Sequence, residues 1–140
     1  FFFFYLKDLT LYKIHLVRGK NRELQIAESY ARIGSKEGLV SNISSGGYLR
    51  KLTDFLMEEF TVTEGEVLKS NINKLLRRLI HLLEEEYGLK VPEVGVDIGV
   101  SSPEDLWLFE YNINRPDTIM HEYEVANLMI PYLLTKINRE

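Results

Sequence analysis

Two strand-like runs near the C-terminus constrain this chain most, because they predict a β-hairpin that sets one acidic residue opposite another. The runs are Val94–Val100 and Leu106–Asn112, and both are rich in β-branched and aromatic residues. The segment between them, Ser101–Asp105, consists of turn-forming residues. Folding the hairpin symmetrically about this turn pairs Asp97 with Glu110. Like charges directly opposite each other destabilise a sheet, so a retained pair indicates a use for both acids.

The same register predicts how side chains divide between the two faces of the hairpin. It pairs Gly95 with Asn112 and Gly99 with Leu108, so Asn112 joins the acids on one face. The other face is expected to belong to the core, with these residues: Val96, Ile98, Val100, Trp107, Phe109 and Tyr111. Two carboxylates and an amide oxygen suit a hard cation such as Mg²⁺. Two alternatives are a solvated hairpin whose acids tolerate each other and a one-residue slip that separates them.

Composition limits the class of protein. The chain has 140 residues, enough for a single domain, and 45% of them are hydrophobic. The 17 Lys and Arg against 21 Asp and Glu give a net charge of −4, which argues against a nucleic-acid partner. The absence of cysteine excludes disulfides and thiolate metal sites, and it is compatible with a cytoplasmic location.

The N-terminal run Phe1–Leu6 is too short to span a membrane, and it lacks the features of a secretory signal. We therefore expect no membrane partner. Four consecutive phenylalanines at an open end would favour aggregation, so we expect the chain to be a fragment of a longer protein, whose other parts meet this segment.

Turn-forming residues divide the first third of the chain into strands. The expected strands are Phe1–Leu6, Thr10–Arg18, Glu23–Ile33 and Leu39–Ile43, with loops at Gly34–Gly38 and Ser44–Gly47. A short helix capped by Thr53 is expected to run through Phe60.

A Thr63–Glu66 capping box is expected to open a long helix that ends at Gly88. Its apolar residues recur at three- and four-residue steps: Leu68, Ile72, Leu75, Leu76, Leu79, Leu82 and Leu83. A last helix is expected over Thr118–Ile137, kinked or split by Pro131. This order of elements predicts an α+β fold, an antiparallel sheet with helices packed on one face.

A second group of polar residues lies in Arg32–Gly47, which reads RIGSKEGLVSNISSGG. Glycines such as Gly46 and Gly47 let backbone N–H groups turn toward an anion. Arg32, at the end of a strand, adds a planar donor group for phosphate or carboxylate. An ordinary polar turn is the alternative interpretation.

Together, the segments ARIGSKEGLVSNISSGG and GVDIGV…LWLFEYNINRP resemble the C-terminal half of an ATP-grasp fold, in its YheC/YheD-like, endospore-coat-associated branch. The resemblance covers about Tyr5 to Leu134. It implies that residues 1–140 are one C-terminal ATP-grasp subdomain, which the missing N-terminal subdomains precede in the full-length protein. It also implies a carboxylate ligase that binds ATP with Mg²⁺ or Mn²⁺. Such an enzyme phosphorylates a small-molecule carboxylate, and an amine or similar nucleophile then attacks the acyl phosphate.

The resemblance also implies roles for the metal-binding and reacting positions. Asp97 and Glu110 would bind the nucleotide-bound Mg²⁺, with Glu110 bridging two ions. Asn112 would bind the second ion through its amide. Arg32 would face the phosphates or the activated acyl group.

Four further positions would contact the nucleotide or border its phosphates. Asn42, Gly46 and Gly47 would lie in the loop beside the phosphates, and Leu108 would lie under the adenine and ribose. The isolated chain, without the preceding subdomains, is expected to be inactive.

The chain also departs from the family pattern. The family has an Asp-x-Arg pair where this sequence has Lys13-Ile14-His15, and a glycine is commoner where Asp117 stands. His15 partly replaces the missing arginine or is a structural residue. A degenerate domain acting as a structural module of the spore coat is therefore the second hypothesis. An unrelated α+β domain with a surface Ca²⁺ or Mg²⁺ site is the third.

Overall fold

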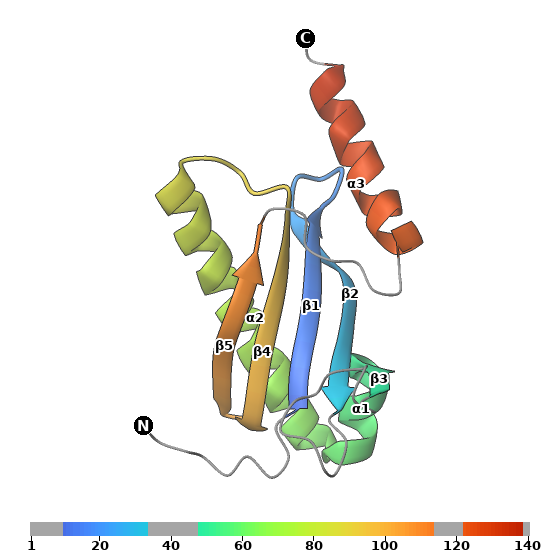
Figure 1. The fold of residues 1–140 in the computed structure, drawn as a ribbon, viewed down its shortest axis with the longest axis vertical. Helices are drawn as coiled ribbons and strands as arrows, with labels where there is room; N and C mark the ends of the chain where they lie inside the picture. The colour runs from blue at the N-terminus through green and yellow to red at the C-terminus, as the bar shows by residue number, and fades with distance from the viewer. Residues whose placement is uncertain (1–9, 34–47, 114–121, 139–140) are drawn as a thin grey trace.

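The computed structural model describes residues 10–33, 48–113 and 122–138. They form an α+β fold, which confirms the predicted fold class, with five strands and three helices (Figure 1). The elements are β1 Thr10–Arg18, β2 Leu24–Ile33, β3 Tyr48–Lys51, α1 Leu52–Glu59, α2 Val62–Tyr87, β4 Glu93–Ser102, β5 Asp105–Asn112 and α3 Glu122–Ile137. The expected strands Phe1–Leu6 and Leu39–Ile43 and both expected loops lie outside the described residues, whereas β3 was not predicted.

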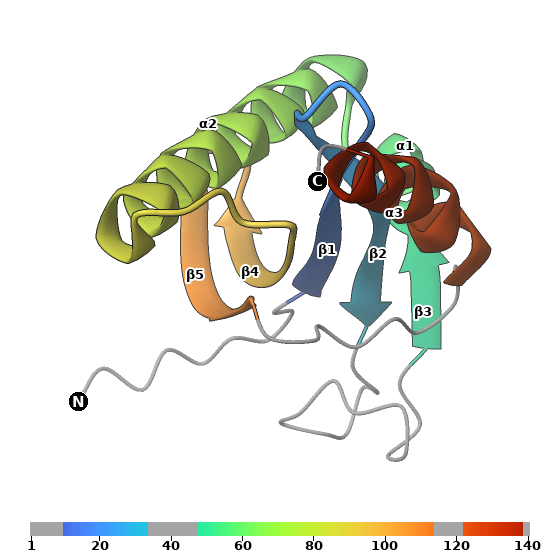
Figure 2. The same cartoon turned by 90° about the horizontal axis from the view of Figure 1, so that it is seen from above.

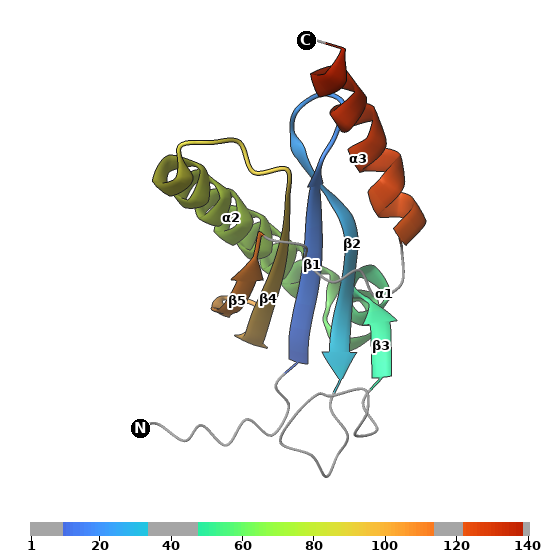
Figure 3. The same ribbon diagram turned by 45° about the horizontal axis from the view of Figure 1, so that its top comes forward.

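The sheet has the order β3-β2-β1-β4-β5, and each neighbouring pair is antiparallel. The strand β1 is therefore central, and it joins the first hairpin to the C-terminal one. Figure 2 shows α1 and α2 lying over the sheet. The helix α3 contacts β1 and β2 near the turn that joins these two strands (Figure 3).

The main core lies between α2 and one face of the sheet, which we call the helix face. The central strands contribute alternate residues to it: Tyr12, Ile14, Leu16, Val94, Val96, Ile98 and Val100. The helix contributes most of the predicted set, Leu68, Ile72, Leu76, Leu79 and Leu83. Leu75 is partly buried and Leu82 is exposed. A helix that packs against a sheet buries one stripe of its surface, and these two residues lie beside that stripe.

The ends of the helices correct two predictions and confirm a third. The helix α1 begins at Leu52, and no side chain caps its N-terminus, so the assignment of Thr53 as its cap is wrong. The capping box of α2 is Thr61 with Glu64, not Thr63 with Glu66. The sequence contains Thr-x-x-Glu twice, two residues apart, and the earlier box extends the helix. Gly88 ends α2 in the left-handed conformation, φ 64°, as predicted.

The last helix is continuous. Pro131 lies inside α3 without splitting it, and α3 buries Val125 and Tyr132. Among the described residues, no helix combines the length and the apolar character needed to cross a membrane.

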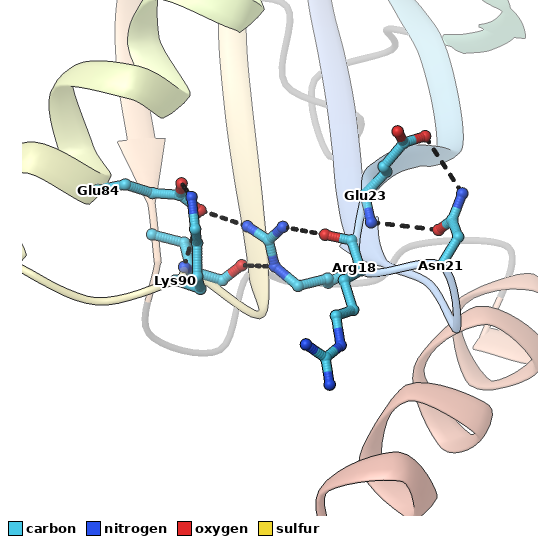
Figure 4. A network of polar contacts seen from close by, with 7 residues as sticks. Arg18, Asn21, Glu23, Glu84 and Lys90 are labelled. Carbon is cyan, nitrogen blue, oxygen red and sulfur yellow. Dashed lines mark hydrogen bonds and ion pairs between the residues drawn. The ribbon is translucent and has the colours of Figure 1, made fainter.

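A buried arginine ties the end of β1 to the C-terminal end of α2 (Figure 4). Arg18 Nε donates to the carbonyl of Val91 at 2.9 Å, and its terminal nitrogens donate to the carbonyl of Arg22 and to Glu84 Oε1. Lys90 Nζ lies 2.6 Å from the other oxygen of Glu84. We call these five residues the Arg18 cluster. It joins the turn between β1 and β2 to the segment between α2 and β4.

Candidate functional site

The predicted pairing of the two acids is confirmed. Asp97 of β4 lies opposite Glu110 of β5, and Gly95 lies opposite Asn112. Since paired residues share a face, the two carboxylates and the amide stand on the face opposite α2. We call this the site face. Asp97 is partly buried, and Glu110 and Asn112 are exposed.

A β-bulge changes the register just beyond the acids. The pairing passes over Phe109, so that Ile98 lies opposite Leu108 and Gly99 opposite Trp107. The predicted pair of Gly99 with Leu108 is therefore wrong, because β5 contains one extra residue. As a result, Leu108 lies on the helix face, and Trp107 takes its expected place beside the acids.

The aromatic half of the predicted hairpin core is also wrong. Trp107 is 51% exposed, Phe109 55% and Tyr111 42%, whereas their expected partners on β4 are buried. The strand β5 lies at the edge of the sheet, and the bulge turns Phe109 over Gly99. A Cβ atom on Gly99 would lie 2.2 Å from the Phe109 ring. Trp107 and Phe109 are thus site-face residues that the spacing did not reveal.

Two cations from neighbouring strands act on Asp97. Lys13 of β1 is its register partner, and Arg32 lies at the end of β2. Burial raises the pKa of the Asp97 carboxyl above its usual value, the charges of Lys13 and Arg32 oppose this rise, and Glu110 adds to it. The site face therefore carries two carboxylates and two cations around one partly buried acid.

A row of buried polar residues lies next to the acids on the site face. His15 is 2% exposed and Glu28 is 4% exposed. His15 Nε2 lies 3.1 Å from Glu93 Oε2, and its Nδ1 lies 3.6 Å from Glu28 Oε1. Enclosed in this way, His15 packs between carboxylates and is not open to a ligand.

The second predicted group is described only in part. Arg32 is partly buried, and within the described residues its Nε has no hydrogen-bond partner. Asn42, Gly46 and Gly47 lie outside the described residues, so their placement beside the phosphates stays a prediction.

The residues at the acid pair fit a hard cation. Within the ranges that the structure describes, no cluster of three or more His, Asp or Glu side chains could hold a metal ion. Asp97 and Glu110 supply two carboxylates, and Asn112 supplies an amide oxygen. Mg²⁺ typically takes one or two protein carboxylates and completes its shell with water and phosphate oxygens, so this oxygen-only set suits it.

The fold and the acid-bearing hairpin define a domain of the ATP-grasp class. A model of the YheC/D-like ATP-grasp family matches residues 12–134, from within β1 into α3. The chain therefore belongs to the YheC/D-like ATP-grasp family, and it is a nucleotide-binding, ligase-like domain. The predicted family resemblance is confirmed. A search of curated protein sequences returns no significant match.

Proposed function

We propose that this domain carries the metal–nucleotide site of an ATP-grasp carboxylate ligase. The observation that carries the proposal is the pairing of Asp97 with Glu110, with Asn112 on the same face. Two carboxylates directly opposite each other in a sheet repel, and a divalent cation bound between them would turn that repulsion into shared coordination. ATP with Mg²⁺ or Mn²⁺ supplies such a cation, and membership of the ATP-grasp family supports nucleotide as its carrier.

The reaction proposed is transfer of the γ-phosphoryl group to a small-molecule carboxylate, followed by attack of an amine or similar nucleophile on the acyl phosphate. Asp97, Glu110 and Asn112 would hold the metal, which supplies charge neutralisation to the phosphates. Arg32 would bind phosphate or acyl-phosphate oxygens. The exposed rings of Trp107 and Phe109 offer a stacking surface for the base, in place of Leu108.

We further propose that the chain works as the C-terminal subdomain of a longer protein. The preceding ATP-grasp subdomains would close over the site face, and Asn42, Gly46 and Gly47 would border the phosphates. This proposal explains why a polar face and exposed aromatic rings lie side by side on β5.

The second candidate function is a degenerate domain that serves as a structural module of the spore coat. Lys13 and His15 stand where the family has its Asp-x-Arg pair, and His15 is enclosed between Glu28 and Glu93. The two functions differ in one readout. A ligase releases ADP in the full-length protein when a suitable carboxylic acid is added, and a structural module does not.

Calorimetry of the full-length protein tests the nucleotide site. We expect Asp97→Ala and Glu110→Ala each to weaken Mg-ATP binding by roughly tenfold or more, since the metal loses a carboxylate. Glu86→Ala, which removes an exposed acid from α2, is the control and should bind like the wild type. Wild-type affinity in both site variants would refute the proposal.

A further inference from the structure

We propose that Lys13 makes the site selective for a metal ion delivered by the nucleotide over the free ion. This inference rests on the proposed function and adds a residue to that site. Its ammonium offsets the charge of the acids in the unliganded site, and it would attract the phosphates of a bound metal–nucleotide complex.

The sheet register places Lys13 at the centre of the charged group. Lys13 of β1 pairs with Asp97 of β4, which in turn pairs with Glu110 of β5. On its other side Lys13 pairs with Tyr30 of β2, two residues before Arg32. Lys13, Asp97 and Glu110 therefore lie in one row across three neighbouring strands, and Arg32 lies near this row.

The charges that act on Asp97 confirm this neighbourhood. Lys13, Arg32 and Glu110 all interact electrostatically with the Asp97 carboxylate, two with positive charge and one with negative. Two cations thus face two carboxylates, and the group is close to neutral. The α2 side contributes no charge to it, because the residues behind Asp97, Val96 and Ile98, are buried and apolar.

A second group of polar residues lies two residues along β1 from Lys13. His15 lies between Glu28 and Glu93, and within the described residues neither Glu28 oxygen has a hydrogen-bond partner. These carboxylates are the same in the wild type and in a Lys13 variant, so a comparison of the two isolates the effect of the Lys13 charge.

Electrostatics then distinguishes the two forms of the metal. A free divalent cation gains little attraction from a neutral group, and Lys13 repels it directly. Mg-ATP still carries net negative charge, so its phosphates attract Lys13 and Arg32 while its cation meets Asp97 and Glu110. These charges should therefore make the site bind Mg-ATP more tightly than free Mg²⁺.

Mn²⁺ binding to the full-length protein, measured by electron paramagnetic resonance with and without ATP, tests this role. In the wild type we expect weak binding of free Mn²⁺ and much tighter binding when ATP is present. Lys13→Met should bind free Mn²⁺ about threefold more tightly or better, and Mn-ATP about threefold less tightly or worse. Lys13→Gln, a second neutral variant, should shift both affinities in the same directions.

Two controls separate charge from packing. Lys13→Arg keeps the charge and should behave like the wild type, and Lys74→Met removes an exposed lysine from α2 and should change neither affinity. Neutral variants that bind both forms like the wild type would overturn this inference while leaving the proposed function intact. A wild-type protein that binds no Mn-ATP would overturn both.

Discussion

The two faces of the sheet differ in how their charged side chains are paired. On the helix face, Arg18 is buried with Glu84, and its donors reach the carboxylate and two backbone carbonyls. On the site face, Asp97 is partly buried with Lys13 as its register partner, and burial raises its pKa. Carboxyl groups whose pKa is perturbed by burial and nearby charges are common at functional sites. The Arg18 cluster joins opposite charges, whereas on the site face two like charges lie opposite each other and burial disfavours the charge of Asp97.

The largest loss of stability is expected from a substitution in the Arg18 cluster. Arg18→Met keeps the aliphatic stem, but it removes the donor to the carbonyls of Val91 and Arg22 and leaves Lys90 as the one cation beside Glu84 within the described residues. Removing one partner of a buried ion pair typically costs about 3–5 kcal/mol, and we expect a loss of that size in urea unfolding. Arg78→Met, which removes an exposed arginine from α2, is the control and should cost less than about 0.5 kcal/mol. A loss below about 1 kcal/mol for Arg18→Met would show that the cluster does not stabilise the fold.

The capping box gives a second, smaller effect on the structural side. Thr61→Ala removes the acceptor for the backbone N–H of Glu64 at the start of α2. Loss of such a cap should lower the free energy of unfolding by about 1 kcal/mol. Thr63 is the second residue of the helix and is not its N-cap, so Thr63→Ala should cost less. Equal losses from the two variants would contradict the assignment of Thr61 as the N-cap of α2.

The site face should respond in the opposite direction. Asp97→Asn removes a partly buried carboxylate that burial disfavours, so we expect the free energy of unfolding to stay the same or to rise by up to about 1 kcal/mol. The same variant should lose Mg-ATP binding. Urea unfolding and calorimetry of one preparation measure both quantities. A variant that is much less stable than the wild type would place Asp97 among the structural charges.

The pH dependence of this difference has a definite sign. The pKa of Asp97 is raised above 3.8 in the folded protein, so its contribution to stability is fully present below that pH and is lost as the pH rises through the folded pKa. The stability advantage of Asp97→Asn over the wild type should therefore be smallest in acid and should grow as the pH rises. Urea unfolding of both proteins between pH 3 and 7 measures it, and an advantage that shrank with rising pH would contradict the assignment.

Local patterns predicted the parts of the molecule that local patterns determine. Alternation along the strands placed Asp97 opposite Glu110, and the helical period found the buried stripe of α2. The bulge at Phe109 was missed, since one extra residue in an edge strand leaves no mark in the spacing. Two equivalent Thr-x-x-Glu patterns left the start of α2 open.

The charges around Asp97 could not be predicted from local patterns, because they come from three different strands. Lys13 and Arg32 reach Asp97 because the sheet order puts β1 beside both β2 and β4. That order comes from pairing between distant segments, which a single sequence does not reveal. The family resemblance led to the acids and to Arg32, but it treated Lys13 as a departure and did not identify it as a member of the site.

Nuclear magnetic resonance of the protein titrated with Mn²⁺, with and without ATP, would place the metal on the molecule. We expect paramagnetic broadening centred on Asp97, Glu110 and Asn112 that deepens when ATP is added and disappears in Asp97→Ala. Broadening that instead spreads over the acidic end of α2, around Glu85 and Glu86, and does not respond to ATP would contradict this expectation.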